Sequence, residues 1–454
     1  MALSARTRRL IQLDKAHVWH PFTQMKDWLA DPEPLVIERG QGSLLFDTEG
    51  RRYIDGVSSL WVTVHGHRKR ELDQAVRAQL GRLAHSTLLG LANVPSIELA
   101  AELIAIAPKG LRKVFYSDAG STAVEIALKI AYQYWANQGR ARKRFITLKE
   151  AYHGDTVGSV SLGGVDLFHA AYKPLLFKTD KLPAPYCYRC PLKKRFPSCK
   201  LACLDPLQAL LERHGEEVAA VVMEPVMMGA AGMLAQPKGY LKRVERLARR
   251  AGTLLVLDEV ATGFGRTGKM WACQHEDVRP DLMACAKGLT GGYLPLAATL
   301  ATDQVYQGFV RDYGEAKAFF HGHTYTGNPL ACAAALASLS LFKSERTLAR
   351  LAPRIKRLAR GLERIGQLPH VGSVRQRGFM AGIELVRDRA TKDAYGYAEQ
   401  MGARACRLAR SRGAILRPLG NVVVLMPPLN IPIPLLDRLV EVTHDSIRQA
   451  TEGA

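Results

Sequence analysis

Long uninterrupted apolar stretches are missing from this sequence. No segment reaches the ~18 consecutive apolar residues that a membrane-spanning helix requires. The first six residues also lack the apolar core of a secretory signal. We therefore expect a cytoplasmic protein that has no membrane partner.

Acidic residues are scarce relative to basic ones. Asp and Glu total 42 against 63 Lys and Arg, which gives a formal net charge of +21. Such a charge can indicate nucleic-acid binding. Here, however, the basic residues are spread through helix-like stretches such as 242–250 and 350–364, and no zinc-finger, homeodomain or RNA-recognition pattern accompanies them. We therefore do not expect nucleic acid as a partner, and interpret the charge as a basic surface that attracts anionic substrates.

Strand-like and helix-like patterns alternate along most of the chain. Short apolar runs separated by helical segments occur at 113–116, 144–147, 218–223 and 253–257. This alternation predicts a mostly parallel sheet with crossover helices on both faces. We assign this large α/β domain to residues 76–334. Residues 335–454 predict a smaller α/β domain, joined in space by the strands and turns expected in residues 1–75.

Two ionisable residues follow buried apolar runs. Asp258 ends the run 254–257, and Lys287 ends the run 282–286 before Gly-Leu-Thr-Gly-Gly. Taken alone, the first could be a helix N-cap and the second a solvated lysine. Together, at the carboxyl ends of neighbouring strands, they suit pyridoxal phosphate. The amine can form a Schiff base, and the carboxylate can keep the pyridine nitrogen protonated. We therefore predict a pyridoxal-phosphate enzyme that holds its cofactor on Lys287.

A phosphate cradle is expected at the turn before residue 122. There the strand-like run 113–116 leads to Gly120 and Ser121, and good helix formers continue to Trp135. Free backbone N–H groups and the helix dipole favour an anion at such a helix start. Gly-Ser turns before helices are common, so this signal is weak by itself.

The segment 258–268, Asp-Glu-Val-Ala-Thr-Gly-Phe-Gly-Arg-Thr-Gly, resembles the signature of class III aminotransferases. The resemblance covers almost the whole chain and implies the fold-type I architecture of pyridoxal-phosphate transferases. Segments 17–22, 58–61, 152–156 and 320–329 are similar to the branch that converts 8-amino-7-oxononanoate to 7,8-diaminononanoate in biotin biosynthesis. Another ω-amino-acid transaminase is the alternative. A non-enzymatic scaffold is disfavoured because Asp258 and Lys287 are both present.

The resemblance also implies roles for individual residues. Lys287 would carry the cofactor and move the proton, Asp258 would bind the pyridine nitrogen, and Tyr152 would stack on the ring. The full cofactor-binding set implied is Gly120, Ser121, Tyr152, Asp258, Lys287, His323 and Thr324. Thr324 would reach the phosphate from the other subunit, which implies a homodimer with shared active sites.

A substrate-binding set is implied in the same way. It consists of Phe22, Leu60, Trp61, Tyr152, Lys287, Gly322 and Arg417. Arg417 would hold the acceptor carboxylate, because a guanidinium can bind it through two hydrogen bonds. Taken alone, an arginine in so basic a chain would be a surface residue. Glu224, at the end of the run 218–223, is expected near the site or in a structural hydrogen bond.

The amino donor is left open between two compounds. S-adenosylmethionine is the donor of most similar enzymes, so it is predicted first. Members that use it tend to have two adjacent tryptophans where this chain has Leu60-Trp61, and a tyrosine where it has Phe22. A sulfonium cation gains roughly 0.5–2 kcal/mol from an aromatic face. Segments 21–27 and 64–69 look more like the smaller branch that uses L-lysine, which is the alternative.

Four of the eight cysteines cluster in one short segment. Cys187, Cys190, Cys199 and Cys203 have the spacing C-x2-C-x8-C-x3-C. Such a set can hold zinc or an iron–sulfur cluster. We therefore predict that these four cysteines form a structural metal site, with a loop of free or paired thiols as the alternative. The aminotransferase chemistry does not require a metal there.

Overall fold

The computed structural model describes residues 3–452 and has a seven-stranded sheet at its centre. In spatial order the strands are β4 (Leu111–Ser117), β12 (Ala297–Thr302), β11 (Leu282–Cys285), β10 (Leu254–Asp258), β7 (Val218–Met223), β5 (Arg144–Leu148) and β6 (Asp180–Leu182). Neighbouring strands from β11 to β6 are parallel, and β12 is antiparallel to both of its neighbours. The parallel strands therefore present their carboxyl ends at one edge of the sheet.

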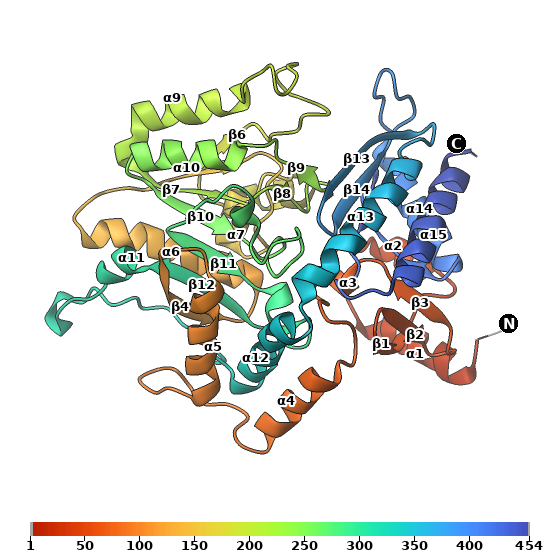
Figure 1. Cartoon of the computed structure of the whole chain (residues 1–454), viewed down its shortest axis with the longest axis horizontal. Helices are drawn as coiled ribbons and strands as arrows, with labels where there is room; N and C mark the ends of the chain where they lie inside the picture. The colour runs from red at the N-terminus through yellow and green to blue at the C-terminus, as the bar shows by residue number, and fades with distance from the viewer. Residues whose placement is uncertain (1–2, 453–454) are drawn as a thin grey trace.

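Both faces of this sheet are covered by helices, as its sequence pattern predicts (Figure 1). In β10, Leu255 and Leu257 belong to one core cluster while Leu254 and Val256 belong to another. Helix α10 (Tyr240–Arg250) contributes to the first cluster and α6 (Gly120–Asn137) to the second. Strand β10 is buried on both faces, which explains its continuous apolar run.

A smaller four-stranded antiparallel sheet lies beside the large one. Its order is β13 (Val371–Arg377), β14 (Met380–Leu385), β17 (Val422–Leu425) and β16 (Arg417–Leu419). The helices of this part are α13 (Thr347–Ile365), α14 (Met401–Ser411) and α15 (Ile433–Glu452).

The N-terminal strands lie beside the C-terminal part of the chain, at the right of Figure 1. Strands β1 (Ile37–Gln41), β2 (Leu44–Asp47) and β3 (Arg52–Asp55) form an antiparallel sheet. Its fourth strand is β15 (Ala414–Ile415), which pairs in parallel with β3.

The N-terminal segment contains the expected strands as β1, β2 and β3, but two helices that were not expected precede them. It begins with helices α1 (Ala5–His17) and α2 (Met25–Ala30). Ser4 caps α1, because its side chain accepts a hydrogen bond from the Thr7 N–H at 3.2 Å. Asp14 joins the two helices by accepting from the Trp28 indole N–H at 2.9 Å. A serine before a helix-compatible stretch was the local signal for α1.

The remaining helices connect these sheets. They are α3 (Ser58–Trp61), α4 (Arg70–Leu80), α5 (Val94–Ile106), α7 (Val157–Leu162), α8 (Asp166–His169), α9 (Asp205–His214), α11 (Asp303–Gln307) and α12 (Pro329–Ser344). The boundaries placed at 75/76 and 334/335 fall inside α4 and α12, so they do not coincide with breaks between elements. In the part of the chain described, no helix is both long and apolar enough to cross a membrane.

Candidate active site

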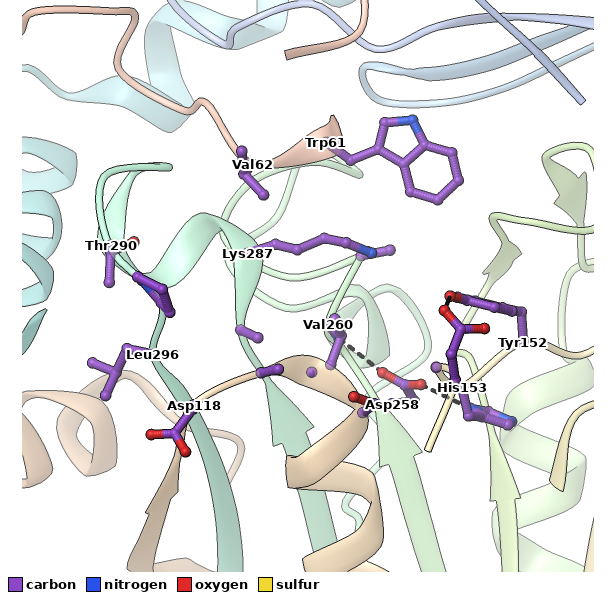
Figure 2. Close-up of a pocket in the computed structure, with 18 of the residues that line it drawn as sticks. Trp61, Val62, Asp118, Tyr152, His153, Asp258, Val260, Lys287, Thr290 and Leu296 are labelled. Atoms are coloured by element: carbon purple, nitrogen blue, oxygen red, sulfur yellow. Dashed lines mark hydrogen bonds and ion pairs between the residues drawn. The ribbon is translucent and has the colours of Figure 1, made fainter. Parts of the chain in front are cut away.

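A cavity of about 700 Å³ opens beyond the carboxyl ends of β10 and β11. Figure 2 shows how its side chains converge. Six residues from the predicted sites line it, namely Gly120, Ser121, Trp61, Tyr152, Asp258 and Lys287. They come from five separate regions of the sequence, so only the fold brings them together.

Lys287 extends into this cavity between Trp61 and Asp258 (Figure 2). Its Nζ lies 5.0 Å from the centre of the Trp61 ring. Burial of the amine lowers the pKa of Lys287, although the negative charges of Asp258 and Glu224 act in the opposite direction. A lowered pKa increases the fraction of neutral amine, which is the nucleophilic form.

Asp258 is held in place by a buried histidine. His153 Nδ1 lies 2.7 Å from Asp258 Oδ2, and the backbone N–H of Val260 donates to Asp258 Oδ1 at 3.0 Å. Burial alone would lower the pKa of His153, but the hydrogen bond and the charges of Asp258 and Glu224 raise it above the ordinary value. The other ring nitrogen of His153 is buried without a partner. These two hydrogen bonds fix the orientation of the Asp258 carboxylate, which lines the cavity.

The role of His153 was missed in the sequence. The Tyr-His-Gly-Asp-Thr segment at 152–156 drew attention to Tyr152, and its partner Asp258 is 105 positions away. The only available signal was a histidine beside the candidate stacking residue.

Glu224 lies at the end of β7 and lines the same cavity. Its carboxylate accepts hydrogen bonds from the N–H of Gly229 at 2.8 Å and of Tyr152 at 3.4 Å. Burial raises the pKa of Glu224 to about 7, and the nearby charge of His153 acts against this shift. Glu224 was expected either near the site or in a structural hydrogen bond. It does both, because it forms these hydrogen bonds while lining the cavity.

Helix α6 begins at the wall of the cavity. A Cβ on Gly120 would lie 2.5 Å from Val260 Cγ1, so only glycine allows this close approach. Ser121 lines the cavity, whereas the Thr122 hydroxyl is already used, because it accepts from the Ala119 N–H at 3.0 Å. The helix start leaves backbone N–H groups available for an anion.

An aromatic wall continues from the cavity toward Arg417. Tyr152, whose hydroxyl donates to Asp155 Oδ2 at 2.7 Å, packs edge-on against Phe168 with ring centres 6.3 Å apart. Phe168 in turn packs edge-on against Phe22 at 5.5 Å. The Arg417 guanidinium lies 6.0 Å from the Phe22 ring, and its Nε is buried without a partner. Phe168 was not among the residues predicted from sequence.

Several predicted site residues do not line the cavity formed by a single chain. They are Phe22, Leu60, Gly322, His323, Thr324 and Arg417. His323 is nevertheless adjacent, because its Nδ1 lies 2.7 Å from Oδ2 of Asp118, which does line the cavity. The side chain of Leu60 is exposed. The charge of Arg417 acts to lower the pKa of Lys287 and of Tyr152, so its guanidinium lies near the cavity although it does not line it.

The four clustered cysteines line a small separate cavity of about 20 Å³. Cys187 is exposed, whereas Cys190, Cys199 and Cys203 are half-buried. Burial, with the neighbouring thiols, raises the pKa of Cys203 to about 11. Within residues 3–452, no three or more His, Cys, Asp or Glu side chains are placed to hold a metal ion. The structure therefore does not show the predicted metal set assembled.

Comparison with known families identifies the fold. The sequence model described as Aminotransferase class-III matches residues 28–447. The chain belongs to the class III aminotransferase family. This confirms the fold-type I α/β architecture that the signature at 258–268 implied.

Individual relatives cover nearly the whole chain. An adenosylmethionine-8-amino-7-oxononanoate aminotransferase of Nitratidesulfovibrio vulgaris is 57% identical over 99% of this chain and 83% of its own length. An enzyme of the same name from Geobacter sulfurreducens is 54% identical over 98% of this chain and 99% of its own length.

Solved structures of aminotransferases also match nearly the whole chain. The crystal structure of the enzyme of that name from Methanocaldococcus jannaschii has a TM-score of 0.93 and 46% identity, and covers 97% of this chain and 99% of its own. An (S)-enantioselective omega-transaminase from Thermomicrobium roseum has the same TM-score at 35% identity, with 98% of each chain covered. The fold is therefore shared by enzymes with different substrates, and the side chains of the site must decide between them.

Proposed function

We propose that this chain transfers an amino group to 8-amino-7-oxononanoate and forms 7,8-diaminononanoate in biotin biosynthesis. The observation that carries the proposal is the convergence of Lys287 and Asp258 in one cavity, in a chain whose relatives at 54–57% identity bear the name of that activity. Its family fixes the reaction type as amino-group transfer.

The cavity fits pyridoxal phosphate as the cofactor. The start of helix α6 at Gly120 and Ser121 suits the phosphate, while the Asp258 carboxylate suits a protonated pyridine nitrogen. Tyr152 offers an aromatic face and Lys287 an amine for covalent attachment. When bound, the cofactor withdraws electrons from the carbon that carries the amino group.

The chain's own residues supply positioning and proton transfer. The Lys287 amine would take a proton from the donor carbon in one half-reaction and would give a proton to the acceptor carbon in the other. His153, through its hydrogen bond to Asp258, holds that carboxylate in position. Trp61 and Tyr152 line the cavity with aromatic side chains beside the Lys287 amine.

Arg417 is proposed to bind the acceptor carboxylate. Its partly buried guanidinium has no carboxylate partner among the described residues. The side chains near it are those of Phe22, Tyr152 and Cys406. The wall of Tyr152, Phe168 and Phe22 between Arg417 and the cavity suits the aliphatic chain of an amino-oxo acid. Leu60 and Gly322 remain predicted members of this pocket.

The donor is proposed to be S-adenosylmethionine, as in the names of the relatives. L-Lysine remains the alternative, because the exposed Leu60 provides no aromatic face for a sulfonium cation.

We further propose a homodimer with shared active sites. Thr324 and Gly322 do not line the cavity of their own chain. The same region exposes large apolar side chains, namely Leu89, Leu91, Phe320 and Tyr325. A second copy would cover these side chains and bring Thr324 to the phosphate end of the neighbouring cavity.

Two experiments test the proposal. Borohydride reduction of the protein loaded with pyridoxal phosphate, followed by peptide mapping, should place the label on Lys287. A label on another lysine would remove that assignment.

Single-turnover absorbance measurements with each donor should then show which one converts the bound cofactor to its amine form. Conversion by lysine but not by S-adenosylmethionine would select the alternative donor.

A further inference from the structure

Glu384 in β14 is a buried carboxylate outside the cavity. Its Oε1 accepts a hydrogen bond from Arg189 Nε at 2.7 Å, and its Oε2 accepts one from Arg375 Nη1 at 2.5 Å. The hydroxyl of Tyr186 also donates to Oε2. We call these four residues the Glu384 clamp. Burial alone would raise the pKa of Glu384, but the hydrogen bonds from Tyr186, Arg189 and Arg375 lower it, so the carboxylate stays charged.

The clamp joins the small antiparallel sheet to the segment that follows the last strand of the large sheet. Glu384 and Arg375 belong to the small sheet, whereas Tyr186 and Arg189 lie in the cysteine-containing segment before α9, which follows the last strand of the large sheet (Figure 1). A second pair of bonds reinforces this junction. Arg189 Nη1 donates to the Lys392 carbonyl at 2.7 Å, and Lys392 Nζ donates to the Tyr188 carbonyl at 2.7 Å.

Arg375 extends the clamp to the wall of the cavity. Its Nη2 donates to the Gly232 carbonyl at 2.8 Å and its Nε to the Met233 carbonyl at 3.1 Å. Both carbonyls belong to the turn between β8 (Met227–Met228) and β9 (Leu234–Ala235). The same turn contains Ala230, which lines the cavity.

The small sheet connects the clamp to Arg417. Glu384 is paired with Val422 across β14 and β17, and Arg417 is paired with Val424 across β16 and β17. Hydrogen-bonded strands move together, so fixing Glu384 also fixes the strand that begins with Arg417.

We infer that Glu384 is a positioning residue that sets the place of Arg417 relative to the cavity and thereby the affinity for the acceptor carboxylate. This inference rests on the proposed role of Arg417 in the aminotransferase. A carboxylate bound by a guanidinium through two hydrogen bonds depends on alignment, so a small displacement of the strand weakens it. Glu384 does not line the cavity, so it would act through Arg417.

Binding of unreactive probes tests the inference without requiring turnover. Nonanoate has the acceptor's chain length and carboxylate, and nonanamide is its neutral counterpart. With the cofactor-loaded enzyme, Glu384→Gln should weaken nonanoate binding in calorimetry by about tenfold, an ordinary coupling between connected residues. Nonanamide binding and the absorbance of the bound cofactor should stay unchanged. Asp437→Asn is the matched control, because Asp437 forms an ion pair with Arg357 at 2.6 Å away from the clamp.

A double-mutant cycle identifies the route of the effect. If the clamp acts through Arg417, Glu384→Gln should have no further effect on nonanoate binding in an Arg417→Ala background. An equal loss in both backgrounds, or an equal loss for nonanamide, would overturn the inference. If Glu384→Gln does not fold, Arg189→Gln provides the same test, and Arg189→Lys should restore part of the affinity. Failure of the proposed function would appear differently, as a wild-type enzyme that binds nonanoate but does not aminate the oxo acid.

Discussion

Among single residues, burial decides which groups around the cavity carry charge. Lys287 has a lowered pKa because its amine is buried, and Glu224 has a raised pKa for the same physical reason. His153 departs from this pattern, since its hydrogen bond to Asp258 outweighs its burial. The cavity therefore combines an amine whose pKa is lowered with a histidine and a carboxylic acid whose pKa values are raised.

Asp258→Asn should retain the cofactor but lose most of the rate. The amide keeps the shape of the side chain but removes the charge that holds the pyridine nitrogen protonated. We expect roughly a 100-fold or larger fall in kcat, as for other lost electrostatic contributions. Stopped-flow measurement of the donor half-reaction checks this, with the bound cofactor quantified by absorbance. A variant with normal kcat would show that the carboxylate does not act on the ring.

Glu224 should make the cofactor-free protein less stable as the pH rises from about 4.5 to about 7. The folded-state pKa is raised, so the folded protein binds a proton that the unfolded chain has released. Its stabilising effect is complete below the unfolded pKa and is lost as the pH rises through the folded one. Glu224→Gln should remove this dependence, which is worth at most about 3 kcal/mol. Urea unfolding at pH 5 and pH 8 measures this change in the free energy of unfolding. The same change in the wild-type protein and in the variant would contradict the raised pKa.

At the scale of elements, strand ends and helix starts place the chemistry. Strands β10 and β11 deliver Asp258 and Lys287 to one edge of the sheet, and α6 begins opposite them. These contributions could be predicted, because the strands are continuous apolar runs followed by a charged residue. Strand β12 was not singled out, since its small apolar residues carry no turn or periodicity signal.

The residues that support the site could not be predicted in this way. His153 meets Asp258 and Arg189 meets Glu384 across 105 and 195 positions, respectively. Nothing local in a sequence marks such partners, because their pairing depends on how whole sheets pack. The first helices were missed for a different reason, since α1 is polar and has only two buried residues, so it has no apolar stripe.

Gly120→Ala should weaken cofactor binding while leaving the fold intact. The added methyl group would approach Val260 to 2.5 Å and push the start of α6 away from the cavity. We expect a loss of affinity for pyridoxal phosphate of about tenfold or more, because misplaced binding groups are costly. Equilibrium dialysis measures it. Gly81→Ala is the control, since its nearest neighbour would be 3.6 Å away, and an equal loss there would argue against the explanation.

At the scale of the whole molecule, the exposed side chains of Leu89, Leu91, Phe320 and Tyr325 indicate an interface with a second chain. Leu89 and Phe320 are 88% and 79% exposed, and exposed large apolar groups gathered in one region indicate an interaction surface. The high net charge does not explain them, because charge attracts anions but does not cover apolar surface.

Leu91→Arg should convert the proposed dimer to single chains with weakened cofactor binding. Light scattering of the wild-type protein should give the mass of two 50.0 kDa chains. The variant should give the mass of one, because a charge buried in an apolar interface is costly. Tyr397→Asp, at an exposed apolar residue outside this region, should leave the dimer intact. A wild-type protein with the mass of a single chain would refute the shared site.

The pairing of β3 with β15 also matters while the protein is being made. Ala414 pairs with Ile54, so the ribosome must add about 360 residues after β3 before its neighbour exists. At common rates of translation this takes roughly 20–70 s, during which the edge of β3 has no partner. An unpaired strand edge is a site of aggregation. Newly synthesised chains should therefore depend on chaperones until residue 414 has left the ribosome tunnel.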